Sequence, residues 1–535
     1  MIDDRCSMTG KSLSLQEQIA QMIVVRASGY LFDHQIRYPA WEAKNSQLQR
    51  WLKDLKLGGV ILLGGSSIEL QARSQQLQSW ATTPLLIAAD VEEGIGQRFP
   101  GGTWFPPPMA LGAIYQRDPQ LARQYAREMG KITAREALAI GINWILAPVV
   151  DVNNNPHNPV INIRAFGDSP EVVAALSSAF IDGAKSYSVL TTAKHFPGHG
   201  DTATDSHLEL PTLAHDDARL AEIELPPFQE AIATDVDSVM TAHLVISAWD
   251  KQQPATLSTE IITGKLRQQL GFAGLVVTDA LIMGGITKYA SPEEAAVMAV
   301  AAGTDILLMP DDPEVAIASI YDAVKSGRIS QERIEQSGQR IWQAKQKVLG
   351  SVNIVPELSS TKAKLTVNSI LQDSLQTVNT PLVALNKGNF RNLIVVDDVL
   401  NASYLDINAP AIAIPQQLGY QRQIVDSNTL DCILLDNRPT LLQIFIRGNP
   451  FRGNAGLTNK TKQIYQQLVT KGKIEAIVIY GSPYVLSWFN SLIEINLPLV
   501  FSYGQMKPAQ AIALKALYDL NFDVLESKSH QNFGF

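Results

Sequence analysis

The 535-residue chain has very few cysteines and no long apolar run. Cys6 and Cys432 are its only cysteines and lie far apart, so we expect neither a disulfide framework nor a thiolate metal site. No uninterrupted apolar stretch approaches the roughly 20 residues that a transmembrane helix needs. The opening MIDDRCSMTGK has acidic side chains where a secretory signal has basic ones, and no apolar segment follows. These absences predict a cytoplasmic protein without a membrane partner.

The chain also lacks an excess of basic residues. It has 44 Lys and Arg against 52 Asp and Glu, which gives a net charge of -8. Because nucleic acids and anionic membrane surfaces require a basic face, we expect neither as a partner. The hydrophobic content of 46% and charged content of 18% are typical of globular proteins. A small neutral substrate fits this composition better, and the length predicts two domains.

Eight short apolar runs alternate with helix-length segments between residues 23 and 310. This alternation indicates βα units, and eight units predict a (β/α)8 barrel of the TIM type. Helix starts are indicated by Ser14 with Glu17 and Ser291 with Glu294, at capping-box spacing, and by Asp118-Pro119 and Ser169-Pro170. The expected strands are IVVRAS from 23, GGVILL from 58, LLIAAD from 85, INWILAP from 142, VLTTAKH from 189, SVMTAHL from 238, GLVVTDA from 274 and DILLMP from 305.

The pattern changes near residue 350, after a predicted last helix. Six further apolar runs begin at residues 393, 411, 432, 441, 474 and 497, separated by helix-length polar segments. They predict a second, smaller α/β sheet domain. This part has no glycine-rich phosphate loop of the P-loop or dinucleotide type, so we predict no cofactor. We expect a barrel domain over 1–350 and an α/β domain over 351–535.

Polar residues follow or end several of the predicted barrel strands. They are Asp90, Lys194 with His195, His243 and Asp279. Because the carboxyl ends of all barrel strands open onto one face, where catalytic groups lie, we expect these side chains to share one pocket.

The segment KHFPGHGDTATDSH, residues 194–207, holds three of the eight histidines. Gly198 and Gly200 allow unusual backbone angles. Asp205 and His207 are two residues apart, so the carboxylate can accept a hydrogen bond from one imidazole nitrogen and leave the other for proton transfer. An imidazole has an ordinary pKa of about 6.5, close to the value that suits a general acid at neutral pH. We therefore predict an acid/base group on this loop.

A zinc site built from His195, His199 and His207 is an alternative for this loop. Pro197 and Gly198 interrupt it, so these histidines are not spaced by a helical turn, and we predict no metal. Asp279 could be a helix cap or an ion-pair partner. A carboxylate opposite a proton donor is, however, the arrangement of retaining glycoside hydrolysis, with the carboxylate as nucleophile.

Four motifs together carry a family resemblance: DVEEGIGQRFPGG from Asp90, NPHNPVINIRAFGDSPEVV from Asn155, KHFPGHGD with DSH, and VVTDALIMGG from Val276. They resemble glycoside hydrolase family 3, in particular its β-N-acetylglucosaminidase branch. The resemblance covers roughly residues 12 to 350, and the rest resembles the αβα sandwich of two-domain members. One departure is Glu92-Glu93-Gly94, where the family often has EGG after its acidic residue.

The resemblance implies roles for individual residues. Asp279 matches the nucleophile that forms a covalent glycosyl-enzyme intermediate, His207 the acid/base and Asp205 its partner. Positions that bind the sugar hydroxyls match Asp90, Arg164, Lys194 and His195, and we expect His243 in the pocket wall near the substrate. The implied activity is exo-acting, retaining removal of terminal β-linked N-acetylglucosamine from peptidoglycan-derived muropeptides or related saccharides, without a cofactor.

Three other functions stay open at this point. A β-glucosidase or β-xylosidase of the same fold is disfavoured by the Asp205-Ser206-His207 triplet. A phosphorylase is a further hypothesis, because a neutral imidazole base would not repel a phosphate acceptor. A sugar-binding protein on a decayed barrel is disfavoured, since none of the implied catalytic or hydroxyl-binding residues is missing.

Overall fold

The computed structural model describes residues 13–349, 357–381, 389–397, 402–426, 429–448, 456–492 and 497–519. The chain divides into two compact units, Met1–Lys364 and Leu365–Phe535. The boundary expected at residue 350 lies outside the described residues, as do Cys6 and the side chain of Cys432.

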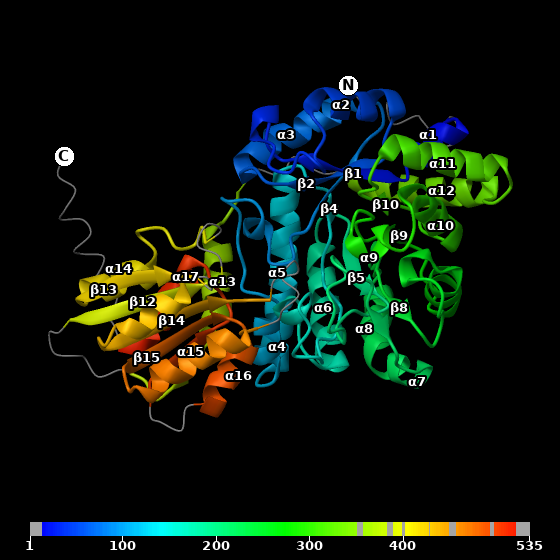
Figure 1. Ribbon diagram of the computed structural model, residues 1–535. Helices are drawn as coiled ribbons and strands as arrows, with labels where there is room; N and C mark the ends of the chain where they lie inside the picture. The colour runs from blue at the N-terminus through cyan, green and yellow to red at the C-terminus, as the bar shows by residue number, and fades with distance from the viewer. Residues whose placement is uncertain are drawn as a thin grey trace, which may run out of the picture. The chain divides into compact units, whose positions relative to one another are not determined.

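Eight parallel strands form the centre of the first unit (Figure 1). Each coincides with a run that the sequence predicted, although β5 extends one residue further, to Phe196. One sheet has the order β10-β1-β2-β3-β4 and another the order β5-β7-β9. Bridges between Trp144 and Leu190 and between Val277 and Ile306 join the two, so the strands close into the predicted barrel. The strands are β1 (Ile23–Ser28), β2 (Gly59–Leu63), β3 (Leu86–Ala89), β4 (Trp144–Ile145), β5 (Thr192–Phe196), β7 (Ser238–Thr241), β9 (Leu275–Thr278) and β10 (Leu307–Leu308). A short parallel pair, β6 (Thr212–Leu213) with β8 (Val245–Ile246), was not predicted.

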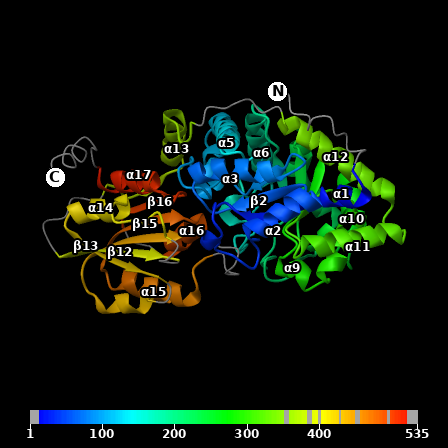
Figure 2. The ribbon, with the colours of Figure 1, turned by 90° about the horizontal axis from the view of Figure 1, so that it is seen from above.

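Helices surround the barrel, and their starts follow the predicted signals (Figures 1 and 2). Ser14 and Glu17 form a complete capping box, and Asp118, Ser169 and Ser291 each cap the helix that follows with a side-chain oxygen. The α-helices are α1 (Leu15–Ala20), α2 (Asn45–Arg50), α3 (Ser67–Trp80), α4 (Met109–Tyr115), α5 (Pro119–Ala139), α6 (Pro170–Ala184), α7 (Asp217–Arg219), α8 (Leu225–Ala233), α9 (Gly284–Thr287), α10 (Pro292–Ala302), α11 (Pro313–Lys325) and α12 (Gln331–Leu349).

A buried carboxylate ties the last helix to the barrel. Asp305, just before β10, is fully buried and accepts a hydrogen bond from the backbone of Val276 in β9 at 3.0 Å. From α12 it accepts hydrogen bonds from Ser337 at 2.7 Å and Arg340 at 3.1 Å. Since a buried charge needs such partners, these contacts fix α12 against the strands that close the barrel.

The second unit is a six-stranded sheet in the order β11-β16-β15-β14-β12-β13, parallel except for β11. Its helices lie on both faces, with α14 and α17 on one and α15 on the other (Figure 2). It is the predicted smaller α/β domain. Its strands are β11 (Gln376–Val378), β12 (Phe390–Val396), β13 (Tyr420–Val425), β14 (Thr440–Ile446), β15 (Ile474–Gly481) and β16 (Leu499–Ser502); its helices include α14 (Pro410–Gln417), α15 (Asn459–Thr470), α16 (Pro483–Leu492) and α17 (Lys507–Tyr518).

Two of the six apolar runs in this unit are not strands. The run from 411 forms α14, which begins at Pro410, and the run from 432 lies in a 3-10 helix, Leu430–Leu435. Short apolar runs do not distinguish a strand from a buried helix.

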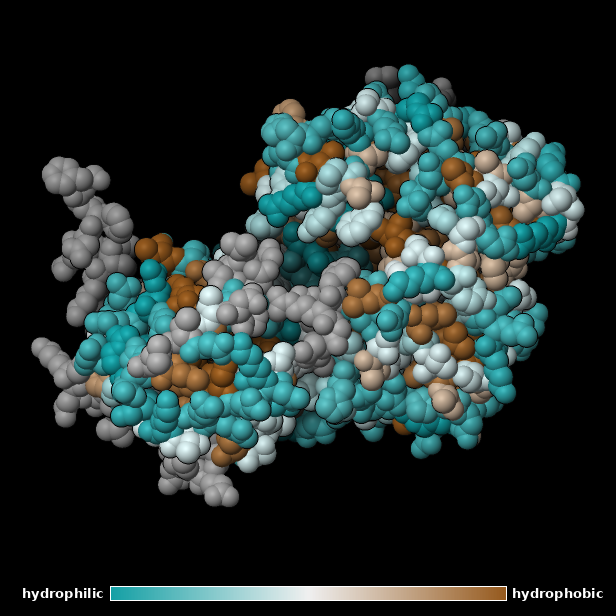
Figure 3. Space-filling view, in the orientation of Figure 1, coloured by the Kyte–Doolittle hydropathy of each residue, from teal (hydrophilic) through white to brown (hydrophobic). Residues whose placement is uncertain are grey.

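Hydrophobic side chains are interspersed with hydrophilic ones over the visible surface of each unit (Figure 3). Within the described part of the chain, no helix is both long enough and apolar enough to span a bilayer.

Candidate active site

The predicted strand-end residues lie at the carboxyl ends of four barrel strands. Asp90 follows β3, and Asp279 directly follows β9. Lys194 and His195 lie near the carboxyl end of β5. His243 comes two residues after β7. The 2.7 Å ion pair between Lys194 Nζ and Asp90 Oδ1 brings strands β3 and β5 together at this face. The expected convergence of these residues is therefore present in the fold.

Two carboxylates and two cations form a cluster on one side of the site. Lys194 Nζ lies 2.7 Å from both Asp90 and Glu92, and Arg164 binds Glu92 with two nitrogens at 2.7 and 2.8 Å. Burial would raise the pKa of Glu92, but Arg164 and Lys194 outweigh it and hold this pKa well below its ordinary value. Lys194 is 1% exposed and Asp90 is 34% exposed. Asp90 is thus the carboxylate of this cluster that a ligand can reach.

Sequence reasoning missed Glu92 as a member of the site. It noted Glu92 only as a departure from a motif, because the partner Arg164 lies 72 residues further along the chain. Arg98, eight residues further along the same loop, donates from Nε to the carbonyl oxygen of Asp90 at 3.1 Å.

Asp151, also missed, is a fully buried carboxylate beneath β5. It accepts hydrogen bonds from His195 Nδ1 at 2.8 Å, from the His195 backbone at 3.1 Å and from the His199 backbone at 2.7 Å. Burial would raise the pKa of Asp151, yet His195 outweighs burial and lowers it. An ionised Asp151 fixes the proton of His195 on Nδ1 and directs Nε2 elsewhere.

The predicted acid/base pair is formed on the loop after β5. His207 Nδ1 lies 2.9 Å from Asp205 Oδ1, and the His207 backbone donates to the same oxygen at 2.9 Å. Asp205 is buried, whereas the His207 side chain is 22% exposed. An ionised carboxylate can only accept this hydrogen bond, so Asp205 holds the imidazole proton on Nδ1.

The loop with the pair is bonded to the loop that follows Asp279. Gly284 and Gly285 donate backbone hydrogen bonds to the carbonyl oxygens of His207 and Ser206, at 3.1 and 3.2 Å. A Cβ at Gly285 would lie 2.8 Å from the Ser206 oxygen, closer than real Cβ atoms come. The two glycines of VVTDALIMGG therefore allow this contact, and the contact links Asp279 to the acid/base pair.

His199 supports the same loop from inside. Its Nε2 lies 2.8 Å from Ser206 Oγ and its Nδ1 2.7 Å from Thr202 Oγ1. Burial lowers the pKa of His199 to about 4, against the opposing charge of Asp151. His199 is thus a neutral structural residue at physiological pH.

Asp279 is held in its ionised form. Its Oδ1 accepts the backbone hydrogen of Ala280 at 2.7 Å. Burial would raise the pKa of Asp279, but His195, His243 and His207 outweigh burial and lower it to about 2. The imidazoles of His195, His243 and His207, which come from different strands and loops, therefore all act on the charge of this carboxylate.

Both ring nitrogens of His243 already have protein partners. Nδ1 lies 2.8 Å from Thr256 Oγ1, and Nε2 donates to the carbonyl oxygen of Ala280 at 3.0 Å. His243 is therefore bonded to Ala280, the residue next to Asp279.

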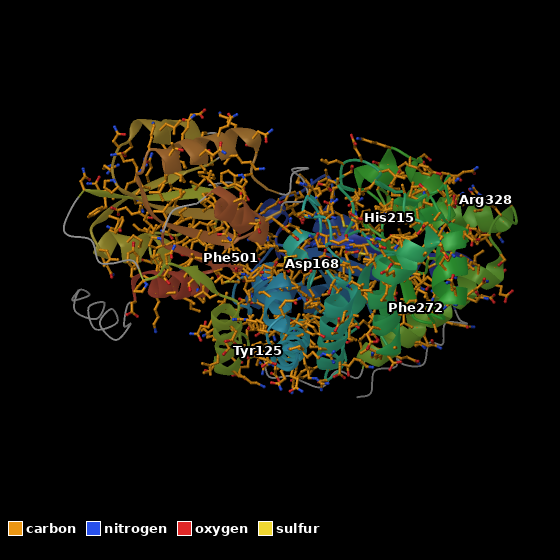
Figure 4. The ribbon with its side chains drawn as sticks, turned by 90° about the horizontal axis from the view of Figure 1, so that it is seen from below. Tyr125, Asp168, His215, Phe272, Arg328 and Phe501 are labelled. Atoms are coloured by element: carbon orange, nitrogen blue, oxygen red, sulfur yellow. The ribbon has the colours of Figure 1, made fainter. Side chains whose placement is uncertain are left out.

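A second layer of charges supports the base of the acid/base loop. His215, labelled in Figure 4, bonds Asp201 at 2.8 Å, and Arg219 lies 3.4 Å from Asp201 and 2.6 Å from Glu224.

Across the described residues, no group of three or more His, Cys, Asp and Glu side chains is arranged to hold a metal ion.

Comparison with known proteins agrees with this geometry. Residues 14–344 match the model of the glycosyl hydrolase family 3 N terminal domain, and residues 384–519 match that of the bacterial glycosyl hydrolase family 3 C-terminal domain. The chain is 35% identical to a beta-hexosaminidase A of Pseudoalteromonas piscicida over 56% of its own length and 55% of the relative's. It is 36% identical to a beta-hexosaminidase of Alkalilimnicola ehrlichii, over 52% of its own length and 81% of that relative.

A solved structure covers both units. A glycoside hydrolase family 3 beta-N-acetylglucosaminidase from Paenibacillus sp. aligns with a TM-score of 0.80 and 28% identity, over 95% of this chain and 97% of that one. The chain spans about half the length of the Pseudoalteromonas relative and most of the Alkalilimnicola one. With its N-terminal model matched over more than half of the sequence, and a barrel whose strand ends carry the expected residues, the chain belongs to glycoside hydrolase family 3.

Proposed function

We propose that this chain is an exo-acting, retaining β-N-acetylglucosaminidase that releases terminal β-linked N-acetylglucosamine through a covalent glycosyl-enzyme intermediate. The observation that carries the proposal is the Asp205–His207 pair at 2.9 Å, bonded through Gly284 and Gly285 to the loop that carries Asp279. The names of the beta-hexosaminidase relatives and of the Paenibacillus structure support the choice of sugar.

In the first step Asp279 is the nucleophile. Its carboxylate is ionised at neutral pH because its pKa lies at about 2. It attacks the anomeric carbon while His207 Nε2 gives its proton to the leaving oxygen, so the glycosidic bond breaks as the ester bond to Asp279 forms. Asp205 stabilises the charged imidazole before the transfer.

In the second step His207 acts as the base. The imidazole, now neutral, takes a proton from water, and the resulting hydroxide bonds to the anomeric carbon as the ester bond to Asp279 breaks. Asp279 leaves as a carboxylate and His207 is charged again, so the site returns to its starting state.

The sugar hydroxyls would be held by the cluster on the other side of the site. Asp90 is the accessible acceptor. Lys194 holds both Asp90 and Glu92 in place, and Arg164 holds Glu92. His195 would present Nε2, because Asp151 holds Nδ1. We assign His243 to positioning of Ala280 and Asp279 rather than to direct hydrogen bonding with the sugar.

The natural substrates that we propose are peptidoglycan-derived muropeptides or related saccharides with a terminal N-acetylglucosamine. The acidic chain, with its net charge of -8, suits a small carbohydrate better than a polyanion.

The test compares release of an aryl group from the β-N-acetylglucosaminide and from the matched β-glucoside. We expect a strong preference for the N-acetyl substrate and a loss of about 10⁴-fold or more in kcat for Asp279→Asn. The variant His207→Ala should be slow with poor leaving groups and much less impaired with activated ones, since only the former need an acid. His157→Ala, at an exposed histidine outside the site, is the matched control.

Two results would overturn the proposal. Faster release from the glucoside would assign the chain to the β-glucosidase alternative. Equal losses of His207→Ala on all leaving groups would remove His207 as the acid. Adding phosphate and analysing the product distinguishes hydrolysis, which yields free sugar, from phosphorolysis, which yields the sugar phosphate.

A further inference from the structure

The second unit contains a cavity of about 320 Å³ at the carboxyl ends of strands β12 and β14. Its walls come from the last residues of both strands, from Leu430, and from the start of α15 with the residues just before it. None of its lining residues belongs to the barrel unit.

The chain path explains why a cavity forms here. From β12 the chain passes through α14 to β13 on one side, whereas from β14 it passes through α15 to β15 on the other. Helices α14 and α15 therefore lie on opposite faces of the sheet (Figure 2). In open parallel sheets, ligands bind in the crevice at the carboxyl ends of two neighbouring strands where the winding reverses in this way.

Two oppositely charged residues line the crevice. Asp397 follows β12 and Arg447 follows β14, and the Arg447 backbone lies 3.5 Å from Asp397 Oδ2. The carboxylate of Asp397 would repel an anionic ligand, and the guanidinium of Arg447 would repel a cationic one. Thr458 and Thr461 add hydroxyls, and the remaining wall is apolar, including Val395, Ile444 and Leu457.

Tyr465 of α15 provides an independent sign of a ligand. Its side chain lines the cavity and is fully buried, and its hydroxyl has no hydrogen-bond partner among the described residues. Burial raises the pKa of Tyr465, and the charge of Asp397, which lines the same cavity, raises it further. A buried hydroxyl without a partner destabilises a folded domain, so its presence needs a reason outside the domain's own packing.

We propose that this cavity is a binding site for a neutral monosaccharide, separate from the barrel pocket. The hydroxyls of such a ligand can form hydrogen bonds with Asp397, Tyr465 and the threonines, and its C–H groups can pack against the aliphatic wall. It has no net charge for Asp397 or Arg447 to repel. Its binding to this unit does not depend on the activity proposed for the barrel.

The test uses Trp488 as a reporter, because its ring lies 6.4 Å from that of Tyr465. The full chain is labelled with 5-fluorotryptophan, and the ¹⁹F resonance of Trp488 is assigned with Trp488→Phe. We expect N-acetylglucosamine or glucose to shift this resonance in a saturable way. Tyr465→Phe and Asp397→Asn should each raise the sugar concentration at the midpoint of the titration at least about tenfold, which corresponds to the loss of one good polar contact. Hydrolysis of the aryl glycoside should be unchanged.

Tyr480→Phe is the matched control in the same unit. The Tyr480 hydroxyl is also buried but donates to Gln443 Oε1 at 3.1 Å. We expect Tyr480→Phe to lower the unfolding temperature and leave the titration intact, whereas Tyr465→Phe should lose binding without a fall in unfolding temperature.

Three outcomes would overturn the proposal. Trp488 could be unmoved by both neutral sugars, or it could respond only to glucose 6-phosphate, which would indicate an anion site. Tyr465→Phe could also titrate like the unmodified chain. Because the readout is not activity, a failure here is distinguishable from a failure of the function proposed for the barrel.

Discussion

At the scale of single residues, Asp151 shows how a buried carboxylate controls a neighbouring imidazole. It binds His195 through both the ring and the backbone and also binds the His199 backbone. An amide in its place can donate as well as accept, so it no longer fixes the proton of His195 on Nδ1.

We therefore expect Asp151→Asn to lower kcat/KM on an aryl N-acetylglucosaminide about 10- to 100-fold, the usual effect of losing such a partner. Asp168→Asn, at an exposed position labelled in Figure 4, should leave kcat/KM unchanged. If both variants had the activity of the unmodified chain, Asp151 would have no part in orienting His195.

His199 makes stability depend on pH. Its pKa is about 4 in the folded protein against an ordinary value near 6.5, so the unfolded chain binds more protons between these values. The folded state is therefore favoured fully above pH 6.5 and loses this advantage as pH falls towards 4, by about 3 kcal/mol in all.

The measurement is the free energy of unfolding of the barrel unit between pH 7 and pH 4. We expect a shallower fall for His199→Asn than for the unmodified chain, because the variant has no imidazole to protonate. Parallel curves would show that His199 does not contribute to the acid sensitivity.

The sequence predicted the positions of the proposed site residues best where they lie at strand ends or within one loop. Asp279 directly follows β9, and the Asp205–His207 pair needs only a two-residue spacing. Glu92 and Asp151 were missed for a common reason. Glu92 bonds to Arg164, 72 residues further along the chain, and Asp151 bonds to His195, 44 residues further along. Asp151 also lies in an irregular stretch after β4, so no local spacing in the sequence indicates either pair.

At the scale of elements, a contact between two loops links the proposed nucleophile to the proposed acid. Gly285 approaches Ser206 so closely that a Cβ would lie 2.8 Å from its carbonyl oxygen. We expect Gly285→Ala to push the acid/base loop outward and to lower kcat by about 100-fold, because a displacement near 1 Å has an effect of this size.

Gly338→Ala is the control for this variant, since nothing lies within 4 Å of a Cβ at that position in α12. It should keep full activity. Steady-state kinetics with a poor leaving group measures the effect, and an unaltered kcat for Gly285→Ala would show that the loop contact does not govern proton transfer.

Elements were predicted where the apolar run and its flanking signals agree. All eight barrel strands coincide with predicted runs, with only β5 extending one residue beyond its run, and Asp118-Pro119 and Ser169-Pro170 begin α5 and α6. The run from 411 could not be read in the same way. Its five residues suit a strand or a helix equally. The run forms α14, which begins at Pro410, and only the packing of the folded sheet distinguishes the two possibilities.

At the scale of the whole molecule, the residues proposed for chemistry all lie in the first unit, residues 1–364. The Alkalilimnicola relative is matched over 81% of its length by 283 aligned residues, so that relative is about as long as the first unit alone.

We therefore expect a chain that ends at Lys364 to fold and to hydrolyse an aryl N-acetylglucosaminide with kcat/KM within about tenfold of the full chain, an effect below about 1.4 kcal/mol in transition-state stabilisation. Circular dichroism and thermal unfolding check its folding beside the kinetics. A folded but inactive truncated chain would show that residues beyond 364 take part in the reaction.

The pairing of Asp205 with His207 within one loop has an evolutionary consequence. A single short gene segment encodes both members of the pair, whereas Asp279 directly follows strand β9 of the barrel. Recombination of that segment alone can deliver or remove the complete proposed proton donor and leave β9 and Asp279 unaltered. The two halves of the chemistry can therefore be inherited separately.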